Sequence, residues 1–299
     1  MNKLFMLIGL PASGKTTCGK RLAEVEDALI VSSDEIRKEL LGDVNDQTKN
    51  EQVFKEVENR IINGLKERNV IYDATNINYK RRMAFLQKIK NAEKIAFLIA
   101  TPYEECIERN NTRERKVPED VIKRMYYNFY IPQYYEGFDE IRIYFNTERN
   151  YWTYDLFKKL DEIPQNNPHH TLTIGKHCKK AALLLEDYDM FKVGLLHDIG
   201  KAETKTFVNT KGETTEIAHY YNHEKVSAYM SLFYTDKTNE RRLLEIANLI
   251  QWHMLLHREL SEKTIIRPTF SYLGKFTISD TVFRQITECI AEKMPEIHK

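Results

Sequence analysis

The sequence has few cysteines, and none of them are clustered. Its four cysteines are spread over 299 residues, and no two of them have the C-x-x-C spacing. A disulfide-stabilised scaffold and a zinc knuckle both need close spacings, so these two classes are excluded. Widely separated thiols are typical of a reducing compartment, and we therefore expect a cytoplasmic protein.

The sequence also lacks a long apolar run and a strong net charge. The N-terminal run LFMLIGL is too short to span a bilayer, and it leads into a glycine-rich loop instead of a small-residue cleavage site. We expect a strand here, not a signal peptide, and no membrane partner. The formal net charge of +1 argues against bulk attraction to nucleic acid but leaves a local basic patch open.

The length and the hydrophobic pattern indicate two domains. A single core rarely grows beyond about 250–300 residues, and this chain has 299. Short apolar runs alternate with helical patterns in the first half, which predicts a parallel sheet. After the turn-rich segment IPQNNPHH at 163–170, helical spacing dominates. We predict an α/β domain over residues 1–163 and an all-α domain over residues 164–299.

The strongest motif is GLPASGKTT at 9–17. It follows an apolar run and precedes a helical pattern, which is the context that a phosphate-binding loop requires. Lys15 should reach the β- and γ-phosphates, and the Thr16 hydroxyl should bind Mg²⁺. Asp73 ends another apolar run and is placed for the Mg²⁺ shell. The predicted binding residues for ATP or another NTP with Mg²⁺ are Gly9, Ser13, Gly14, Lys15, Thr16, Thr17 and Asp73.

Two further segments carry charges that suit phosphoryl transfer. SSDEIR places Asp34 and Arg37 on one face of a helix that starts there. The carboxylate can accept the proton of an incoming hydroxyl, and the guanidinium can hold a phosphate of the acceptor; alternatively, Asp34 only caps the helix. The segment RNNTRERKVPEDVIKRM, with Arg109, Arg113 and Arg115, forms either a lid that stabilises the transferred phosphoryl group or a solvated basic helix.

Taken in order, GLPASGKTT, SSDEIR, IYDATN and RNNTRERKVPEDVIKRM resemble the phage-type 5′-hydroxyl polynucleotide kinase family. The resemblance covers roughly the first half of the chain and implies a P-loop kinase fold. It implies that Asp34 is the general base for a 5′-OH and that Arg37 holds the 3′-phosphate of the terminal nucleotide. Arg109 and Arg113 would be lid residues on the donor phosphates.

The second half contains a His-Asp pair in the segment LLHDIGK at 195–201. Adjacent His197 and Asp198 can ligate a metal ion, provided that other histidines complete the shell. A single histidine is more often an ordinary core or surface residue. None of the nine histidines lies in the first half of the chain, which weakens that alternative.

The histidine spacing and the segment NPHHTLTIGKH resemble the HD phosphohydrolase superfamily over residues 164–299. The resemblance implies a metal centre with Lys201 near the scissile phosphate, and its later histidines favour two metal ions over one. Imidazole ligands suit a divalent transition metal such as Mn²⁺, Ni²⁺ or Co²⁺. The family closes the shell with a distal aspartate, for which Asp280 and Glu292 are alternatives here. The implied ligands are His177, His197, Asp198, His223 and His253.

Together the two halves resemble the bacterial end-healing proteins of nucleic-acid repair. This resemblance implies NTP-dependent phosphorylation of 5′-OH ends of RNA or DNA. It also implies removal of a 2′-, 3′- or 2′,3′-cyclic phosphate from the other end, with a separate ligase as a partner. Two alternatives stay open: a nucleoside or metabolite kinase fused to a nucleotide phosphohydrolase, and a nucleotide-sensing regulatory protein.

Overall fold

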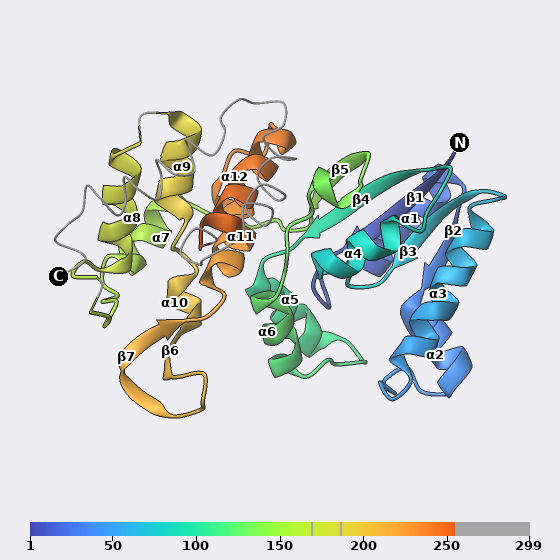
Figure 1. Ribbon diagram of the computed structural model, residues 1–299, viewed down its shortest axis with the longest axis horizontal. Helices are drawn as coiled ribbons and strands as arrows, with labels where there is room; N and C mark the ends of the chain where they lie inside the picture. The colour runs from blue at the N-terminus through green and yellow to red at the C-terminus, as the bar shows by residue number, and fades with distance from the viewer. Residues whose placement is uncertain (169, 186, 255–299) are drawn as a thin grey trace. The chain divides into compact units, whose positions relative to one another are not determined.

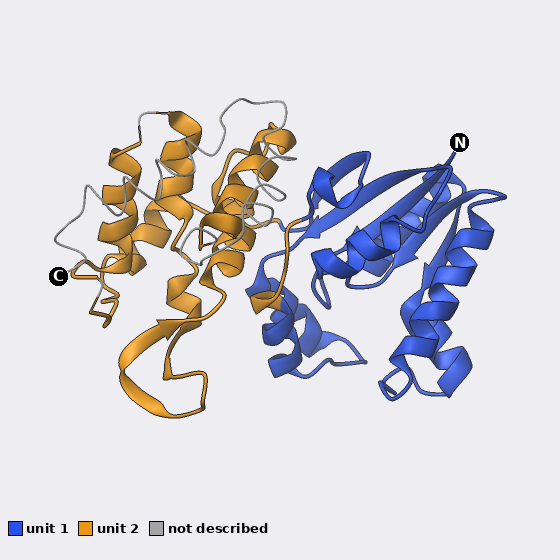
Figure 2. Ribbon diagram, viewed as in Figure 1, with its two compact units in different colours: residues 1–125, 132–147 blue, residues 126–131, 148–299 orange. Residues whose placement is uncertain are grey.

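The computed structural model describes residues 1–168, 170–185 and 187–254. The chain divides into two compact units, one of residues 1–125 and 132–147, the other of residues 126–131 and 148–299 (Figure 2). The segment between residues 147 and 164, which contains helix α7 (Thr153–Leu160), thus belongs to the second unit. The domain limits 1–163 and 164–299 stay a prediction.

The first unit is built on a sheet of five parallel strands in the order β2-β3-β1-β4-β5 (Figure 1). The predicted parallel sheet is therefore confirmed. Its strands are β1 (Asn2–Ile8), β2 (Ala28–Ser32), β3 (Asn69–Asp73), β4 (Ala92–Ala100) and β5 (Glu140–Phe145). Its helices are α1 (Lys15–Glu26), α2 (Ser33–Leu41), α3 (Asn50–Gly64), α4 (Tyr79–Leu86), α5 (Tyr103–Thr112), all but the last two residues of α6 (Glu119–Tyr127) and the short 3₁₀ helix η1 (Tyr134–Glu136).

The central strand β1 explains why the sheet forms where it does. Its residues from Leu4 to Ile8 are all apolar and all buried. A parallel strand that is covered on both faces needs such a continuous run, because both sets of alternating side chains pack into the core. The strand ends direct the polar residues that follow β1, β2 and β3 to one edge of the sheet, where ligands bind in open α/β folds.

A buried ion pair joins α4 to η1 in this unit. Arg82 Nε and Nη2 each donate to a carboxylate oxygen of Glu136 at 2.6 Å, and both side chains are 1% exposed. Arg82 Nη1 also donates to the carbonyl of Asn76, and Glu136 accepts from the amide of Gln133. Burial raises the pKa of Glu136, and the Arg82 charge opposes that rise. The pair is thus satisfied on both sides, as a buried charge requires.

The second unit is mainly helical. Besides α7 it contains α8 (Ile174–Leu183), α9 (Tyr188–Leu196), α10 (Lys201–Thr204), α11 (His223–Tyr234) and α12 (Glu240–Trp252). The predicted helical domain is confirmed, but the sequence pattern missed an antiparallel hairpin of β6 (Lys205–Val208) and β7 (Thr214–Tyr220). Gly212, at φ +83°, lies in the turn between these strands and is a local signal for it. Among the described residues, no helix combines the length and hydrophobicity needed to cross a membrane.

We predict that Arg82→Ala destabilises the first unit by about 3–5 kcal/mol, because it leaves the Glu136 carboxylate buried without its partner. Hydrogen exchange of the β1 amides measures this free energy of local opening. The matched control is Arg142→Ala, because Arg142 pairs with Glu140 at the surface, where the side chains are 37% and 41% exposed. That change should cost at most about 1 kcal/mol. Equal effects of the two substitutions would contradict the assigned role of the buried pair.

Candidate phosphate-binding and metal sites

The loop between β1 and α1 has the backbone shape that a phosphate-binding loop needs. Ala12 and Gly14 both adopt positive φ angles, +61° and +93°, and Gly14 is the residue before α1. A Cβ atom on Gly14 would lie 2.4 Å from Asn146 Nδ2, and one on Gly9 would lie 2.7 Å from Ser13 Oγ. Gly14 suits this position because its φ is positive, and a side chain on Gly9 would require Ser13 to shift. The first N–H groups of α1, which have no intrahelical partner, follow this loop.

The side chains of this loop point to a nucleotide and its metal ion. Thr16 Oγ1 donates to Asp73 Oδ2 at 2.9 Å, which brings together a hydroxyl and a carboxylate of the kind that hold Mg²⁺ in P-loop enzymes. Lys15 Nζ donates to the carbonyl of Leu10 at 2.6 Å. Burial lowers the pKa of Lys15 to about 8, opposed by the charge of Asp73. Burial raises the pKa of Asp73 in turn.

The remaining residues predicted for the nucleotide site differ in their surroundings. Ser13 is fully buried, and its Oγ has no hydrogen-bond partner, while its carbonyl accepts from Thr101 Oγ1 and Asn146 Nδ2. Thr17 is exposed on α1. Ser13 therefore helps to shape the loop through its backbone, a role that the motif alone did not indicate.

Asp34 and Arg37 lie on α2 but face different neighbours. Ser32 caps α2 by accepting from the amide of Glu35, so Asp34 is not the capping residue. Asp34 is exposed, and its Oδ2 pairs with Arg115 Nη1 at 2.6 Å. Arg37 is 3% exposed and donates to the carbonyl of Asp46 at 2.8 Å, while its Nε is buried without a partner.

The three arginines of the expected lid segment also have different surroundings. Arg109 donates to Glu105 at 3.1 Å and to the carbonyl of Asn146 at 2.9 Å, so it braces the residue that contacts the phosphate-binding loop. Burial, followed by the charge of Arg115, lowers the pKa of Arg113, and its Nε is buried without a partner. Arg115 is the residue that reaches Asp34, and the transfer of roles from the kinase resemblance missed it.

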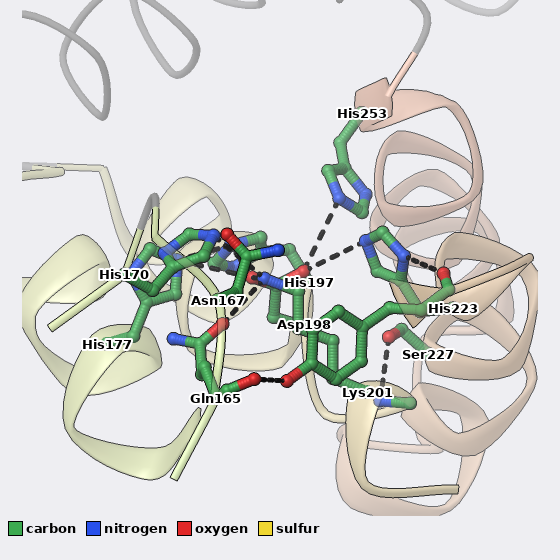
Figure 3. A network of polar contacts seen from close by, with 12 residues as sticks. Gln165, Asn167, His170, His177, His197, Asp198, Lys201, His223, Ser227 and His253 are labelled. Atoms are coloured by element: carbon green, nitrogen blue, oxygen red, sulfur yellow. Dashed lines mark hydrogen bonds and ion pairs between the residues drawn. The ribbon is translucent and has the colours of Figure 1, made fainter. Parts of the chain in front are cut away.

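In the second unit, four histidines surround the carboxylate of Asp198, which is 3% exposed. Figure 3 shows His177 on one side of Asp198 and His223 and His253 on the other. Asp198 Oδ2 lies 3.2 Å from His177 Nε2 and 3.1 Å from His197 Nε2. Asp198 Oδ1 lies 3.1 Å from His223 Nε2 and 3.7 Å from His253 Nε2. These residues come from α8, from α11 and from the ends of α9 and α12.

Backbone carbonyls fix the orientation of three of these rings. The Nδ1 atoms of His197, His223 and His253 lie 2.7–2.8 Å from the carbonyls of Gly194, Tyr220 and Ile250 respectively. A carbonyl can only accept, so each Nδ1 carries the proton and each Nε2 is left with a free lone pair. The Nε2 atoms of His223 and His253 are buried without a hydrogen-bond partner. Metal-ligating histidines are held in this way.

The charges of the cluster suit cation binding. Burial alone would raise the pKa of Asp198, but the neighbouring His197 and the ammonium group of Lys201 hold it well below its usual value. Burial lowers the pKa of His253 to about 4, opposed by the nearby carboxylate of Asp198, so the ring is neutral at pH 7. Neutral imidazole and ionised carboxylate are the forms that bind metal.

The cluster contains two groups that each fit one metal ion. One is His177, His197 and Asp198, and the other is Asp198, His223 and His253. The shared carboxylate offers one oxygen to each group, and imidazole with carboxylate favours divalent transition metals. Asp280 and Glu292, the alternatives for a further ligand, lie outside the described residues.

Lys201 and Gly200 complete the surroundings of this centre. Lys201 Nζ lies 2.7 Å from Asp198 Oδ2 and 2.9 Å from Gln165 Oε1. The amide of Gly200 donates to Ser227 Oγ, and a Cβ on Gly200 would lie 2.6 Å from the carbonyl of His223. The glycine in HDIGK thus lets α10 approach α11. Gln165 and Ser227 were not predicted, and no spacing in the sequence marks them.

We predict that the protein binds about two Mn²⁺ ions per chain, one for each group of ligands. His253→Ala should lower the metal content to about half, because the group around His177 keeps its ligands, whereas Asp198→Ala should remove nearly all of it. Elemental analysis after dialysis measures the content. Asp189→Ala, on the surface of α9, is the control and should keep the wild-type content. Full metal content in the Asp198 variant would contradict the shared-ligand arrangement.

Each of the two units contains a segment that matches a known domain family. Residues 4–132 match the family model of the AAA domain, and residues 169–275 match that of the HD domain. L-seryl-tRNA(Sec) kinase of Methanococcus maripaludis is 28% identical over 176 residues, which cover 54% of this chain and 66% of that protein. A chain of the Pnkp1/Rnl/Hen1 RNA repair complex is 29% identical with a TM-score of 0.39, and the match covers 42% of each chain.

Shikimate kinase from Acinetobacter baumannii is 20% identical with a TM-score of 0.35, over 50% of this chain and 86% of that one. The chain thus spans less than half the length of the RNA-repair chain that it matches, and about two thirds of the curated kinase. The two resemblances indicated by the motifs are confirmed at the level of the domains: residues 4–132 match an AAA-type P-loop domain, and residues 169–275 match an HD domain.

Proposed function

We propose that the protein heals nucleic-acid ends, preparing a 5′-phosphate with one unit and a free ribose hydroxyl with the other. The observation that carries the proposal is the presence on one chain of two centres of complementary chemistry. One has the donor set for a Mg²⁺-nucleotide, and the other has two histidine groups around a shared carboxylate. The first adds a phosphoryl group, and the second removes one. A separate ligase would then join the ends, because ligation requires a 5′-phosphate and a free hydroxyl.

In the kinase unit, Lys15 would bind the β- and γ-phosphates, and Thr16 with Asp73 would hold Mg²⁺. Asp34 follows β2 at the same edge of the sheet as the phosphate-binding loop, where an acceptor hydroxyl can approach both. Its carboxylate would accept the proton of the 5′-OH as the new P–O bond forms. Arg37 would hold the 3′-phosphate of the terminal nucleotide. Arg109 and Arg113 would be lid residues that contact the phosphates of the donor nucleotide.

In the HD unit, a bound metal pair would supply a water of lowered pKa and polarise a phosphoryl oxygen. The residues of the chain would orient that pair and exclude bulk water, since the ligand side chains are at most 9% exposed. Lys201 would neutralise charge next to Asp198. The substrates of this unit would be 2′-, 3′- or 2′,3′-cyclic phosphate ends, which arise together with 5′-OH ends when RNA is cleaved by transesterification.

A second candidate acceptor is favoured by the similarity to L-seryl-tRNA(Sec) kinase. That protein's name indicates a hydroxyl carried on an aminoacyl group rather than at a 5′ end. The two candidates share the same phosphate donor and differ only in the acceptor. Transfer of labelled γ-phosphate to a 5′-OH oligonucleotide, to seryl-tRNA and to free nucleosides therefore separates them, and preference for either of the latter two would overturn the end-healing proposal.

We predict that Asp34→Ala reduces 5′ phosphorylation by at least about 10²-fold, because it removes the proton acceptor, while ATP affinity stays within about twofold of wild type. Lys15→Ala should instead weaken ATP binding as well, since it removes a charge from the donor phosphates. Glu35→Ala, next in sequence and also exposed, is the control and should keep activity. Near-normal turnover in the Asp34 variant would show that the base is another group.

We predict that Asp198→Ala abolishes phosphate release from a 2′,3′-cyclic end while 5′ phosphorylation continues, because the kinase unit holds its own nucleotide and Mg²⁺. Both activities are measured on one oligonucleotide with a 5′-OH and a 2′,3′-cyclic phosphate. The phosphatase should respond to Mn²⁺, Ni²⁺ or Co²⁺ more than to Mg²⁺. Loss of both activities would show that the two centres are not independent, and retention of both would make the His-Asp pair structural.

A further inference from the structure

The ammonium group of Lys201 has all three of its hydrogen-bond directions occupied. Besides Asp198 Oδ2 at 2.7 Å and Gln165 Oε1 at 2.9 Å, its Nζ lies 3.3 Å from His170 Nε2 (Figure 3). An ammonium group has three donors and no lone pair. The contact with His170 therefore has one polarity: Lys201 donates, and His170 Nε2 accepts.

This polarity fixes the tautomer of His170. A neutral imidazole that accepts at Nε2 carries its proton on Nδ1, so His170 Nδ1–H is a donor. That atom is buried and has no hydrogen-bond partner among the described residues. Buried donors are nearly always paired in folded proteins, and an orphan donor calls for an explanation. The unpaired Nε2 atoms of His223 and His253 face Asp198 and are explained by metal binding, whereas His170 belongs to neither group of ligands.

The position of His170 ties it to the metal centre. Its ring packs edge-on against the ring of His177, with centroids 4.9 Å apart and an interplanar angle of 77°. Lys201 contacts both His170 and the carboxylate of Asp198, which the two ligand groups share. Tyr220 contacts both neighbours of His170 in this network: its hydroxyl donates to the carbonyl of Gln165, and its ring lies 5.3 Å from Lys201 Nζ.

We propose that His170 is an additional substrate-contacting residue of the HD centre, whose Nδ1–H donates to a non-bridging oxygen of the phosphoryl group. This proposal rests on the proposed phosphohydrolase function of the same site. A donor that is already oriented and shielded from water stabilises charge that develops on a phosphoryl oxygen. Lys201 would act through His170, because its contact keeps the proton on the nitrogen that faces the substrate.

Three substitutions separate the donor role from packing. His170→Asn places an amide nitrogen near the position of Nδ1 and keeps a donor there. His170→Gln reaches the position of Nε2 and removes the Nδ1 donor, and His170→Phe keeps the ring against His177 without any polar atom. Each variant is studied as the full chain loaded with Mn²⁺. The readouts are metal content, affinity for inorganic phosphate by calorimetry, and turnover of a 2′,3′-cyclic phosphate end.

We expect all three variants to keep the wild-type metal content. The Gln and Phe variants should bind inorganic phosphate about tenfold more weakly and lose about 10²-fold or more in kcat, while the Asn variant recovers most of both. Unchanged phosphate affinity in the Phe variant, loss of metal from it, or no phosphate binding by the wild type would overturn the proposal. If the wild type binds phosphate but hydrolyses no nucleic-acid end, the proposed function fails, and the phosphate measurements still decide the role of His170.

Discussion

The buried carboxylate of Asp198 is the constraint on which the second unit depends. A carboxylate this deeply buried is costly unless other groups compensate its charge, and here the compensation comes from residues on four helices and the segment after α9. Each of these segments must therefore place its side chain within reach of one carboxylate. The same requirement explains why Gly200 follows so closely, because a larger residue would push α10 away from α11.

The first unit follows a different principle, in which the backbone rather than one charge gathers the site. Parallel strands deliver the residues that follow them to a common edge, and the phosphate-binding loop, Asp34 and Asp73 arrive there from three adjacent strands. The buried pair of Arg82 and Glu136 holds α4 to η1. Binding residues can therefore be exposed, as Asp34 is, without loss of the fold.

Much of this organisation could be predicted from local patterns. The order of strands and helices follows from apolar runs, and the loop shape follows from glycines in a fixed spacing. The hairpin β6–β7 was missed because its strands are short and half exposed, so no buried alternation marks them. The contacts of Arg109, Arg115 and His170 could not be predicted, because each depends on a partner that the fold brings from far along the chain.

Two of the predicted metal-ligand histidines have a second role at the ends of helices. His197 and His253 are the capping residues at the C-terminal ends of α9 and α12. In each of them, Nδ1–H donates to a carbonyl of the last helical turn. Carbonyls of the last turn have few intrahelical partners, although the Ile250 carbonyl also accepts from the backbone N–H of His253. The negative end of each helix macrodipole points toward the predicted cation site. Fraying of either helix end would thus release a predicted ligand. Metal binding at this centre would therefore depend on the order of these two helix ends.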